Sequence, residues 1–364
     1  MIRRSTNPFT PTFGSMPYML AGRTELIDDV MEGLANRPGD PNRSTIFIGP
    51  RGSGKTVLLR TIADESKAMG WVSAEVTAHE GMLDEILSEL RKNASHLLDP
   101  QVESVVTAVQ AGPVGITREV REAAHPFRFD FEDIVEELNG KDVGVLIVVD
   151  EIDPHCRELE RLASVYQLLI GEGRDVALLM AGLPGRVMAL LLNEHISFIR
   201  RAFQRALATI PQHEVEEALR ETIVQNGRVI DDDALVCVAQ STKGFALAIQ
   251  LVGYYLWRQG RPEDRLTMAD AERAIVRARE EMERSVFLPT LAELRPREHE
   301  YLQAMAQDDG PSATSDIAAR MGISMTNASN LRRRLIEHGV IHEVRMGLVD
   351  FEMPMMREYL QGRA

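Results

Sequence analysis

A glycine-rich segment near the N-terminus contains residue types that suit the binding of a phosphate chain. Residues 49–56 read GPRGSGKT, between a short apolar run at 45–48 and a helical pattern at 56–69. Glycines let backbone N–H groups approach phosphate oxygens closely, and the start of a helix adds a positive dipole end. Lys55 suits the β- and γ-phosphates and the Thr56 hydroxyl suits Mg²⁺, so we predict an ATP and Mg²⁺ site. Its predicted members are Gly49, Pro50, Arg51, Gly52, Ser53, Gly54, Lys55, Thr56 and Val57.

Two acidic residues follow a second apolar run, about ninety residues further along the chain. Residues 145–149 read VLIVV, and Asp150 and Glu151 come directly after them. A buried parallel strand places these acids at its C-terminal edge, where open α/β sheets bind their ligands. We predict that Asp150 holds Mg²⁺ together with Thr56, and that Glu151 polarises the attacking water.

Short apolar runs separated by helical patterns predict the architecture that positions these groups. The pattern indicates an α/β fold with a doubly wound, mostly parallel sheet that is covered on both faces. The predicted strands lie at 45–48, 71–76, 143–149, 176–180 and 207–210. A turn at 110–113 is expected inside an insertion.

After Pro211 the strand signals stop and amphipathic helices follow. They are predicted at 214–225, 232–240, 245–258 and 268–284, with Asp231 and Thr267 as N-caps for two of them. We therefore predict a nucleotide-binding core at 1–211, an all-α lid at 212–284 and a third domain at 285–364. The third domain is expected to begin with a linker at 285–294.

The C-terminal residues have the pattern of a winged helix-turn-helix. Helices are predicted at 315–321 and 324–338, with Ser324 as N-cap of the second, and a two-stranded wing at 341–345 and 348–352. Residues 312–364 contain seven arginines and six acids, a net charge of +1 against −14 for the whole chain. The basic residues gather on the second helix, which favours local contact with double-stranded DNA. The predicted DNA-binding residues are Thr326, Asn327, Asn330, Arg333, Arg334 and Arg345. Winged helices also dock on proteins, so a protein partner remains open.

The bulk composition fits a folded protein of two or three domains. The chain has 364 residues, 44% of them hydrophobic and 26% charged, and its two cysteines are too few for a disulfide framework. The net charge of −14 opposes nonspecific DNA binding by a generally basic surface. The apolar segment at 176–192 is broken by glycines, a proline and an arginine, and the N-terminus lacks an apolar leader, so we expect a cytoplasmic protein without a membrane span.

The adjacent acidic pair and the helical lid make the chain similar to AAA+ ATPases. It most resembles the origin-recognition and archaeal replication-initiator branch, from about residue 7 to residue 360. Similar bacterial proteins share the opening seen at 7–11, NPFTP, which leads to Ala21, Gly22 and Arg23. In that family this segment lies over the nucleotide. The resemblance also implies that Arg201 reaches the γ-phosphate of a neighbouring subunit in a homo-oligomer, with Arg200 and Arg205 as rivals.

Two positions depart from the pattern of that family. Residues 181–184, AGLP, stand where many AAA+ enzymes place a polar side chain that orients the attacking water, and Leu247 stands where the lid often supplies an arginine. Slow ATP hydrolysis is therefore expected.

Three functions follow from these patterns. The first is a nucleotide-dependent switch that binds DNA through the winged helix. The second is a signalling ATPase of the STAND type, whose winged helix contacts the ATPase core or a protein partner. The third is a small-molecule kinase, which is disfavoured because the C-terminal third of the chain is a lid and a winged helix.

Overall fold

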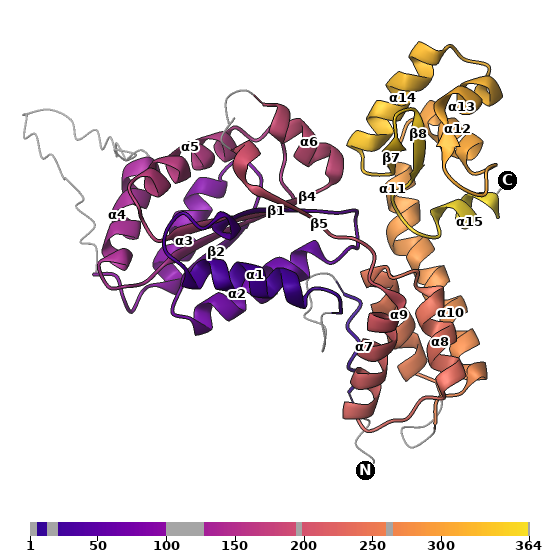
Figure 1. Ribbon diagram of the computed structural model, residues 1–364, viewed down its shortest axis with the longest axis horizontal. Coiled ribbons are helices and arrows are strands. Elements are labelled where there is room, and N and C mark those ends of the chain that lie inside the picture. Colours follow the sequence, from indigo (N-terminus) through magenta and orange to yellow (C-terminus); the bar gives the residue numbers. More distant parts are fainter. Residues whose placement is uncertain (1–5, 13–20, 100–126, 194–198, 260–264, 363–364) are drawn as a thin grey trace, which may run out of the picture.

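The structure is a computed structural model that describes residues 6–12, 21–99, 127–193, 199–259 and 265–362 (Figure 1). The turn predicted at 110–113 lies outside these residues. Figure 1 shows a sheet flanked by helices, a bundle of helices at the lower right, and a C-terminal group of elements at the upper right. In the described part of the chain, no helix has the length and apolar character required to cross a bilayer.

The sheet is parallel throughout. Its strands are β1 (Ser44–Ile48), β2 (Val72–Thr77), β3 (Val145–Asp150), β4 (Val176–Gly182) and β5 (Phe203–Ala206). They lie in the order β2-β3-β4-β1-β5, and each neighbouring pair is parallel. The strand order reverses beside β1, so the loop after β1 opens into the crevice where doubly wound sheets bind ligands. The predicted fold class is confirmed.

Helices cover both faces of this sheet. They are α1 (Thr24–Ala35), α2 (Lys55–Ala68), α3 (Met82–Asn93), α4 (Phe127–Asn139), α5 (Arg157–Gly171) and α6 (Pro184–Leu192). Alternate strand residues point to opposite faces, so Phe47 packs with α1 and α2, while its neighbour Ile46 packs with the side chains of α3 to α6. We call β1 to β5 with α1 to α6 the sheet unit.

The last strand of the sheet unit differs from the prediction. The sequence predicted a strand at 207–210, but β5 is Phe203–Ala206, and only the backbone N–H of Leu207 continues the ladder, to the carbonyl of Ile48. As an edge strand, β5 has one neighbour, and most of its residues are exposed. An exposed edge strand does not have to be apolar. The prediction, which relied on apolar runs, therefore placed the strand at the buried residues that follow, Leu207 and Ile210.

The lid consists of α7 (Gln212–Gln225), α8 (Asp232–Ser241), α9 (Ala246–Trp257) and α10 (Met268–Met282). Thr267 and Asp270 form a capping box at the start of α10. Asp231 occupies the N-cap position of α8, but its side chain accepts no capping hydrogen bond there. Phe9 packs into the lid: a Cβ at Gly253 would lie 2.3 Å from its ring. The N-terminal segment therefore crosses α9.

The linker predicted at 285–294 is largely helical. A π-helical turn (Glu283–Phe287) and α11 (Leu288–Ala292) continue the chain of α10 without a break. Pro289 lacks an N–H and clashes with a regular helix around it, and the wider π-turn before it accommodates this residue. Val286, Phe287 and Leu291 are buried in the same apolar cluster as the lid. The prediction of a linker was therefore wrong, because the helix predicted to end at residue 284 continues to Ala292.

The C-terminal elements are arranged as predicted for a winged helix-turn-helix. The helices are α12 (Pro296–Met305), α13 (Thr314–Met321), α14 (Met325–Glu337) and α15 (Met356–Gln361), and the strands are β6 (Ser312–Ala313), β7 (Ile341–Arg345) and β8 (Leu348–Phe351). The strands pair antiparallel in the order β6-β8-β7, and the hydroxyl of Ser324 caps α14 by accepting from Asn327 N. The short strand β6 was not predicted. We call α12 to α15 with these strands the C-terminal unit.

The C-terminal unit touches the sheet unit where α14 ends (Figure 1). Gly185 at the start of α6 lies against the backbone there: a Cβ at position 185 would lie 2.3 Å from the Cα of Glu337 and 2.5 Å from the carbonyl oxygen of Ile336. Glycine is thus required for this close approach. A Cβ at Gly339 would contact the side chain of Leu183. The end of α14 and Gly339 after it therefore pack against the residues that directly follow β4.

Candidate functional site

The loop between β1 and α2 forms a compact cradle. Gly52 and Gly54 have φ of 80° and 92°, which bend the backbone in a way that other residues rarely adopt. Ser53 is buried and its hydroxyl donates to the carbonyl of Pro50 at 2.9 Å. A Cβ at Gly49 would lie 2.5 Å from that hydroxyl oxygen, so the loop closes only over glycine. The loop is followed directly by the N-terminus of α2, and this arrangement fits a phosphate chain.

Lys55 lies across this cradle. Its Nζ donates to the carbonyl oxygens of Gly49 at 2.8 Å and Pro50 at 2.7 Å, both in the same loop. Burial lowers the pKa of Lys55 to about 8, although Asp150 and Glu151 act in the opposite direction. A charged amine that is held by backbone carbonyl oxygens of this loop is suited to meet the negative charge of a ligand.

Asp150 and Thr56 lie together across two elements. The Thr56 hydroxyl on α2 donates to Oδ2 of Asp150 at the end of β3, at 2.5 Å, and Oδ1 of Asp150 accepts from the backbone of Glu151 at 2.8 Å. A hydroxyl and a carboxylate side by side are oxygen ligands of the kind Mg²⁺ takes. Glu151 is exposed and has φ of 50°, an unfavourable backbone conformation for this residue type. It directly follows the last residue of β3.

The lid rests directly on the loop. The backbone N–H of Leu247 donates to the carbonyl of Gly52 at 3.1 Å, and a Cβ at Gly52 would lie 3.0 Å from the ring of Phe245. Arg23 is buried beneath this contact and donates to the carbonyl of Ala208 at 2.9 Å. The residue at position 247 thus contacts the loop through an apolar side chain and a backbone group.

The end of β4 has no room for a longer side chain. A Cβ at Gly182 would lie 2.4 Å from the side chain of Ile152, which follows the acidic pair. Residues 176–182 are all buried. A polar group that orients water cannot stand at Gly182 unless Ile152 moves.

Arg201 is exposed at the sheet edge and makes no hydrogen bond or ion pair with the residues that the structure describes. Its two rivals are occupied: Arg200 donates to the carbonyl of Leu191 at 2.6 Å, and Arg205 pairs with Asp29 at 2.9 Å. Among these arginines, Arg201 is the one whose exposed side chain is available to another molecule.

The residues predicted to contact DNA are exposed together on one unit. On α14 they are Thr326, Asn327, Asn330, Arg333 and Arg334, and Arg345 is exposed at the wing. Ala328 and Leu335 are fully buried beneath them. Arg333 has a loose ion pair with Glu337 at 3.8 Å, and Arg334 lies 4.0 Å from Glu298, whose side chain is 2% exposed.

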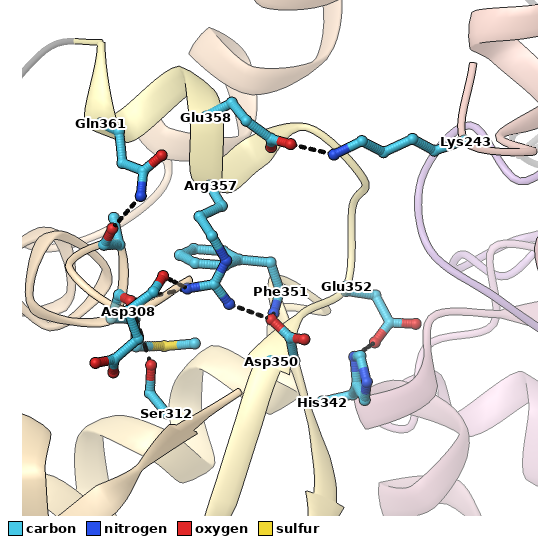
Figure 2. A network of polar contacts seen from close by, with 12 residues as sticks. Lys243, Asp308, Ser312, His342, Asp350, Phe351, Glu352, Arg357, Glu358 and Gln361 are labelled. Atoms are coloured by element: carbon cyan, nitrogen blue, oxygen red, sulfur yellow. Dashed lines mark hydrogen bonds and ion pairs between the residues drawn. The ribbon is translucent and has the colours of Figure 1, made fainter. Parts of the chain in front are cut away.

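Several contacts around the cradle were not predicted. Arg51, predicted to bind nucleotide, donates to both carboxylate oxygens of Glu293 at 3.0 Å each. Figure 2 shows Lys243 paired with Glu358, and the pair of His342 with Glu352 at 3.0 Å. The hydrogen bond with Glu352 raises the pKa of His342. Each of these pairs joins residues far apart in the chain or on different strands, and no local pattern marks them.

Comparison with known proteins agrees with this geometry. A Walker-type ATPase of Pyrococcus abyssi is similar in structure with a TM-score of 0.69 at 16% identity, over 94% of this chain and 96% of that one. The ORC2 protein of Aeropyrum pernix, solved with ADPNP and ADP, has a TM-score of 0.61 at 14% identity, over 97% and 96%. The CDC6 protein of Pyrobaculum aerophilum has a TM-score of 0.50 at 15% identity, over 97% of each chain.

Sequence comparison adds less. Residues 284–360 match the model of a domain of unknown function, DUF8462, and no protein with a curated description matches the chain. At this level of identity the solved structures establish the fold. The chain therefore shares the fold of the Walker-type ATPase and of the ORC2 and CDC6 proteins.

Proposed function

We propose that the chain is an ATP-binding switch, whose loop at 49–56 holds ATP with Mg²⁺. The observation that carries this proposal is the meeting of Lys55, Thr56 and Asp150 at the carboxyl edge of the parallel sheet. A Mg²⁺ ion held at this place would supply positive charge against the charge that develops on the phosphates during hydrolysis. Thr56 and Asp150 would hold the ion, and Lys55 would exchange its bonds to Gly49 and Pro50 for bonds to phosphate.

Glu151 is the proposed base for the attacking water. It follows Asp150, the proposed Mg²⁺ ligand, and it is exposed. A water molecule can therefore reach its carboxylate. Slow hydrolysis is supported by two features: Gly182 leaves no space for a polar water-orienting group, and Leu247 brings no charge to the phosphates. Arg201 would complete the site of a neighbouring copy of the chain, because a guanidinium stays charged and binds phosphate in two places.

For the C-terminal unit we propose binding to double-stranded DNA through α14 and the wing. Asn330 and Arg333 lie on the exposed side of a helix that Ala328 and Leu335 anchor, and these residue types suit base edges and phosphates. Among the solved structures, those of the ORC and CDC6 proteins share the fold across this unit as well.

A STAND-like signalling ATPase is the second candidate. It is favoured by the docking of the end of α14 on Gly185 of α6, which places the C-terminal unit against the ATPase core. In this alternative the C-terminal unit would respond to the nucleotide and contact a protein.

Two measurements test these functions. Calorimetry with ATP and Mg²⁺ is expected to show binding by the wild-type chain and a large loss for Lys55→Ala, because the cation at the phosphates is removed. Equal affinities would contradict the nucleotide site. Fluorescence anisotropy with duplex DNA, with and without ATP, then separates the candidates: binding supports the DNA switch, and its absence at low salt in every nucleotide state favours the signalling protein.

A further inference from the structure

Cations around the phosphate-binding loop are matched by carboxylates from the end of the chain. Glu293 after α11 holds both ends of the Arg51 guanidinium. Glu358 on α15 pairs with Lys243, which precedes the lid helix α9 (Figure 2). We call Glu293 and Glu358 the rim carboxylates.

A backbone contact docks the C-terminal unit, which carries Glu358 and begins shortly after Glu293. The end of α14 meets Gly185 so closely that a single added Cβ would lie within 2.3 Å of Glu337. Gly185 lies at the start of α6, which follows β4 on the same edge of the sheet as the loop at 49–56. The C-terminal unit is thus docked on the sheet unit beside the candidate nucleotide site.

The rim carboxylates and a triphosphate are both negatively charged, so both would pair with the cations around the loop. A guanidinium that is bound at both ends by a carboxylate cannot bind phosphate in the same way. Two ligands that need one set of cations lower each other's affinity, and this effect is reciprocal.

We propose that docking of the C-terminal unit opposes ATP binding, and that ATP displaces Glu293 from Arg51. The docked arrangement is then the nucleotide-free form of the switch, and ATP favours release of α14 and the wing from α6. This inference rests on the proposed ATP site. The docking contact is also tested on its own, without nucleotide.

Two variants remove different parts of the contact. Glu293→Gln keeps the size of the side chain but removes the charge that holds Arg51; Glu300→Gln is its matched control, because Glu300 is equally exposed, at 51% against 52%, and pairs with Arg297 on α12. Gly185→Ala places a methyl group against Glu337; Gly171→Ala is its control, because a Cβ there has nothing within 4 Å. Both glycines lie in helices.

Calorimetry with ATP and Mg²⁺ gives the first result. Glu293→Gln is expected to tighten ATP binding by about two- to fivefold, the size expected for loss of an exposed ion pair that competes with the ligand. Gly185→Ala is expected to tighten it further, because it disturbs all the docking contacts together. The two controls should match the wild type. Unchanged or weaker ATP binding in both docking variants would overturn the proposal.

Hydrogen exchange of peptides covering 183–190 and 335–340 gives the second result. Without nucleotide, Glu293→Gln and Gly185→Ala should exchange faster than the wild type in both peptides, and this comparison holds even if the chain does not bind ATP. Adding ATP with Mg²⁺ to the wild type should increase exchange in the same peptides. Slower exchange with ATP would mean that ATP tightens the docking and would overturn the proposal; no ATP binding by calorimetry would instead remove the proposed function.

Discussion

The hydroxyl of Thr56 and the carboxylate of Asp150 lie 2.5 Å apart, although 94 residues separate them in the chain. This contact joins the start of α2 to the end of β3, and it sets the position of the proposed Mg²⁺ ion. Replacing Asp150 with Asn keeps the shape but removes the negative charge. We expect the increase in ATP affinity on adding Mg²⁺ to be largely lost in Asp150→Asn. Calorimetry with and without Mg²⁺ measures this; an unchanged Mg²⁺ effect would exclude Asp150 as a ligand.

The affinity for ATP should depend on pH through Lys55. Burial lowers the pKa of Lys55 to about 8, and the charged groups that act on it are Asp150, Glu151, Arg51 and Glu352. Below this pKa the amine is already charged and binds phosphate directly. Above it, ATP binding must be accompanied by uptake of a proton, so affinity should fall by up to about tenfold per pH unit. Calorimetry from pH 6.5 to 9 in buffers of different ionisation enthalpy measures both the fall and the proton uptake.

The matched variant for this pH dependence is Lys55→Arg. An arginine remains charged across the same range, so any ATP binding by this variant should vary much less with pH. A wild-type affinity that stays constant between pH 7 and 9, without proton uptake, would contradict the role of Lys55.

Glu151 combines a proposed catalytic role with an unfavourable backbone conformation. Glu151→Gln should bind ATP with similar affinity and lose turnover, because the amide keeps the shape but cannot accept a proton. Glu151→Asn should also lose turnover, but its unfolding free energy should rise by about 0.5–1 kcal/mol, since Asn tolerates φ of 50° better. Phosphate release and thermal unfolding check the two effects. Normal turnover in Glu151→Gln would remove it as the base.

The sequence predicted local parts of the site better than its surroundings. The loop at 49–56 and the acids after β3 were predictable because neighbouring residues determine each of them: glycines permit the turn, and five apolar residues bury the strand. The ion pair of Arg51 with Glu293 was not, because the two residues are 242 positions apart in the chain and the helix before Glu293 places it. That helix was predicted as a linker, so the acid that follows it had no expected position. The docking at Gly185 was missed for the same reason, since one glycine in an apolar run carries no sign of a distant partner.

Arg201 should act between two copies of the chain. If it completes a neighbouring site, ATP turnover per subunit should rise with protein concentration, and Arg201→Ala should abolish that rise while leaving turnover in dilute solution unchanged. Arg200→Ala is the control, because Arg200 is also exposed but donates to the carbonyl of Leu191. An equal loss for Arg201→Ala in dilute monomer would place the effect within one chain. Loss only in Arg200→Ala would assign the role to Arg200.

The DNA hypothesis is tested best by residues that can change without affecting folding. Arg333 is such a residue: its side chain is 70% exposed and its ion pair with Glu337 is long, so Arg333→Ala should cost little stability. Asn330 is exposed on the same helix. Arg334 is less suitable, because it lies 4.0 Å from the buried carboxylate of Glu298. Its removal leaves that charge less compensated, so a double change of Arg333 and Arg334 would mix DNA binding with stability.

We therefore expect Arg333→Ala to lower duplex affinity and to make the slope of log affinity against log salt shallower by about one unit, as for one lost phosphate contact. Asn330→Ala should instead reduce discrimination between sequences, because an amide reads base edges. Arg297→Ala, which changes a 65% exposed arginine on α12, is the matched control and should leave both quantities unchanged.

ATP affinity should be the same in all three variants, since the loop at 49–56 belongs to the sheet unit. Anisotropy titrations at several salt concentrations measure these effects. If Arg333→Ala and Arg297→Ala bind duplex DNA equally well, α14 does not contact DNA, and its docking on α6 then favours the signalling function.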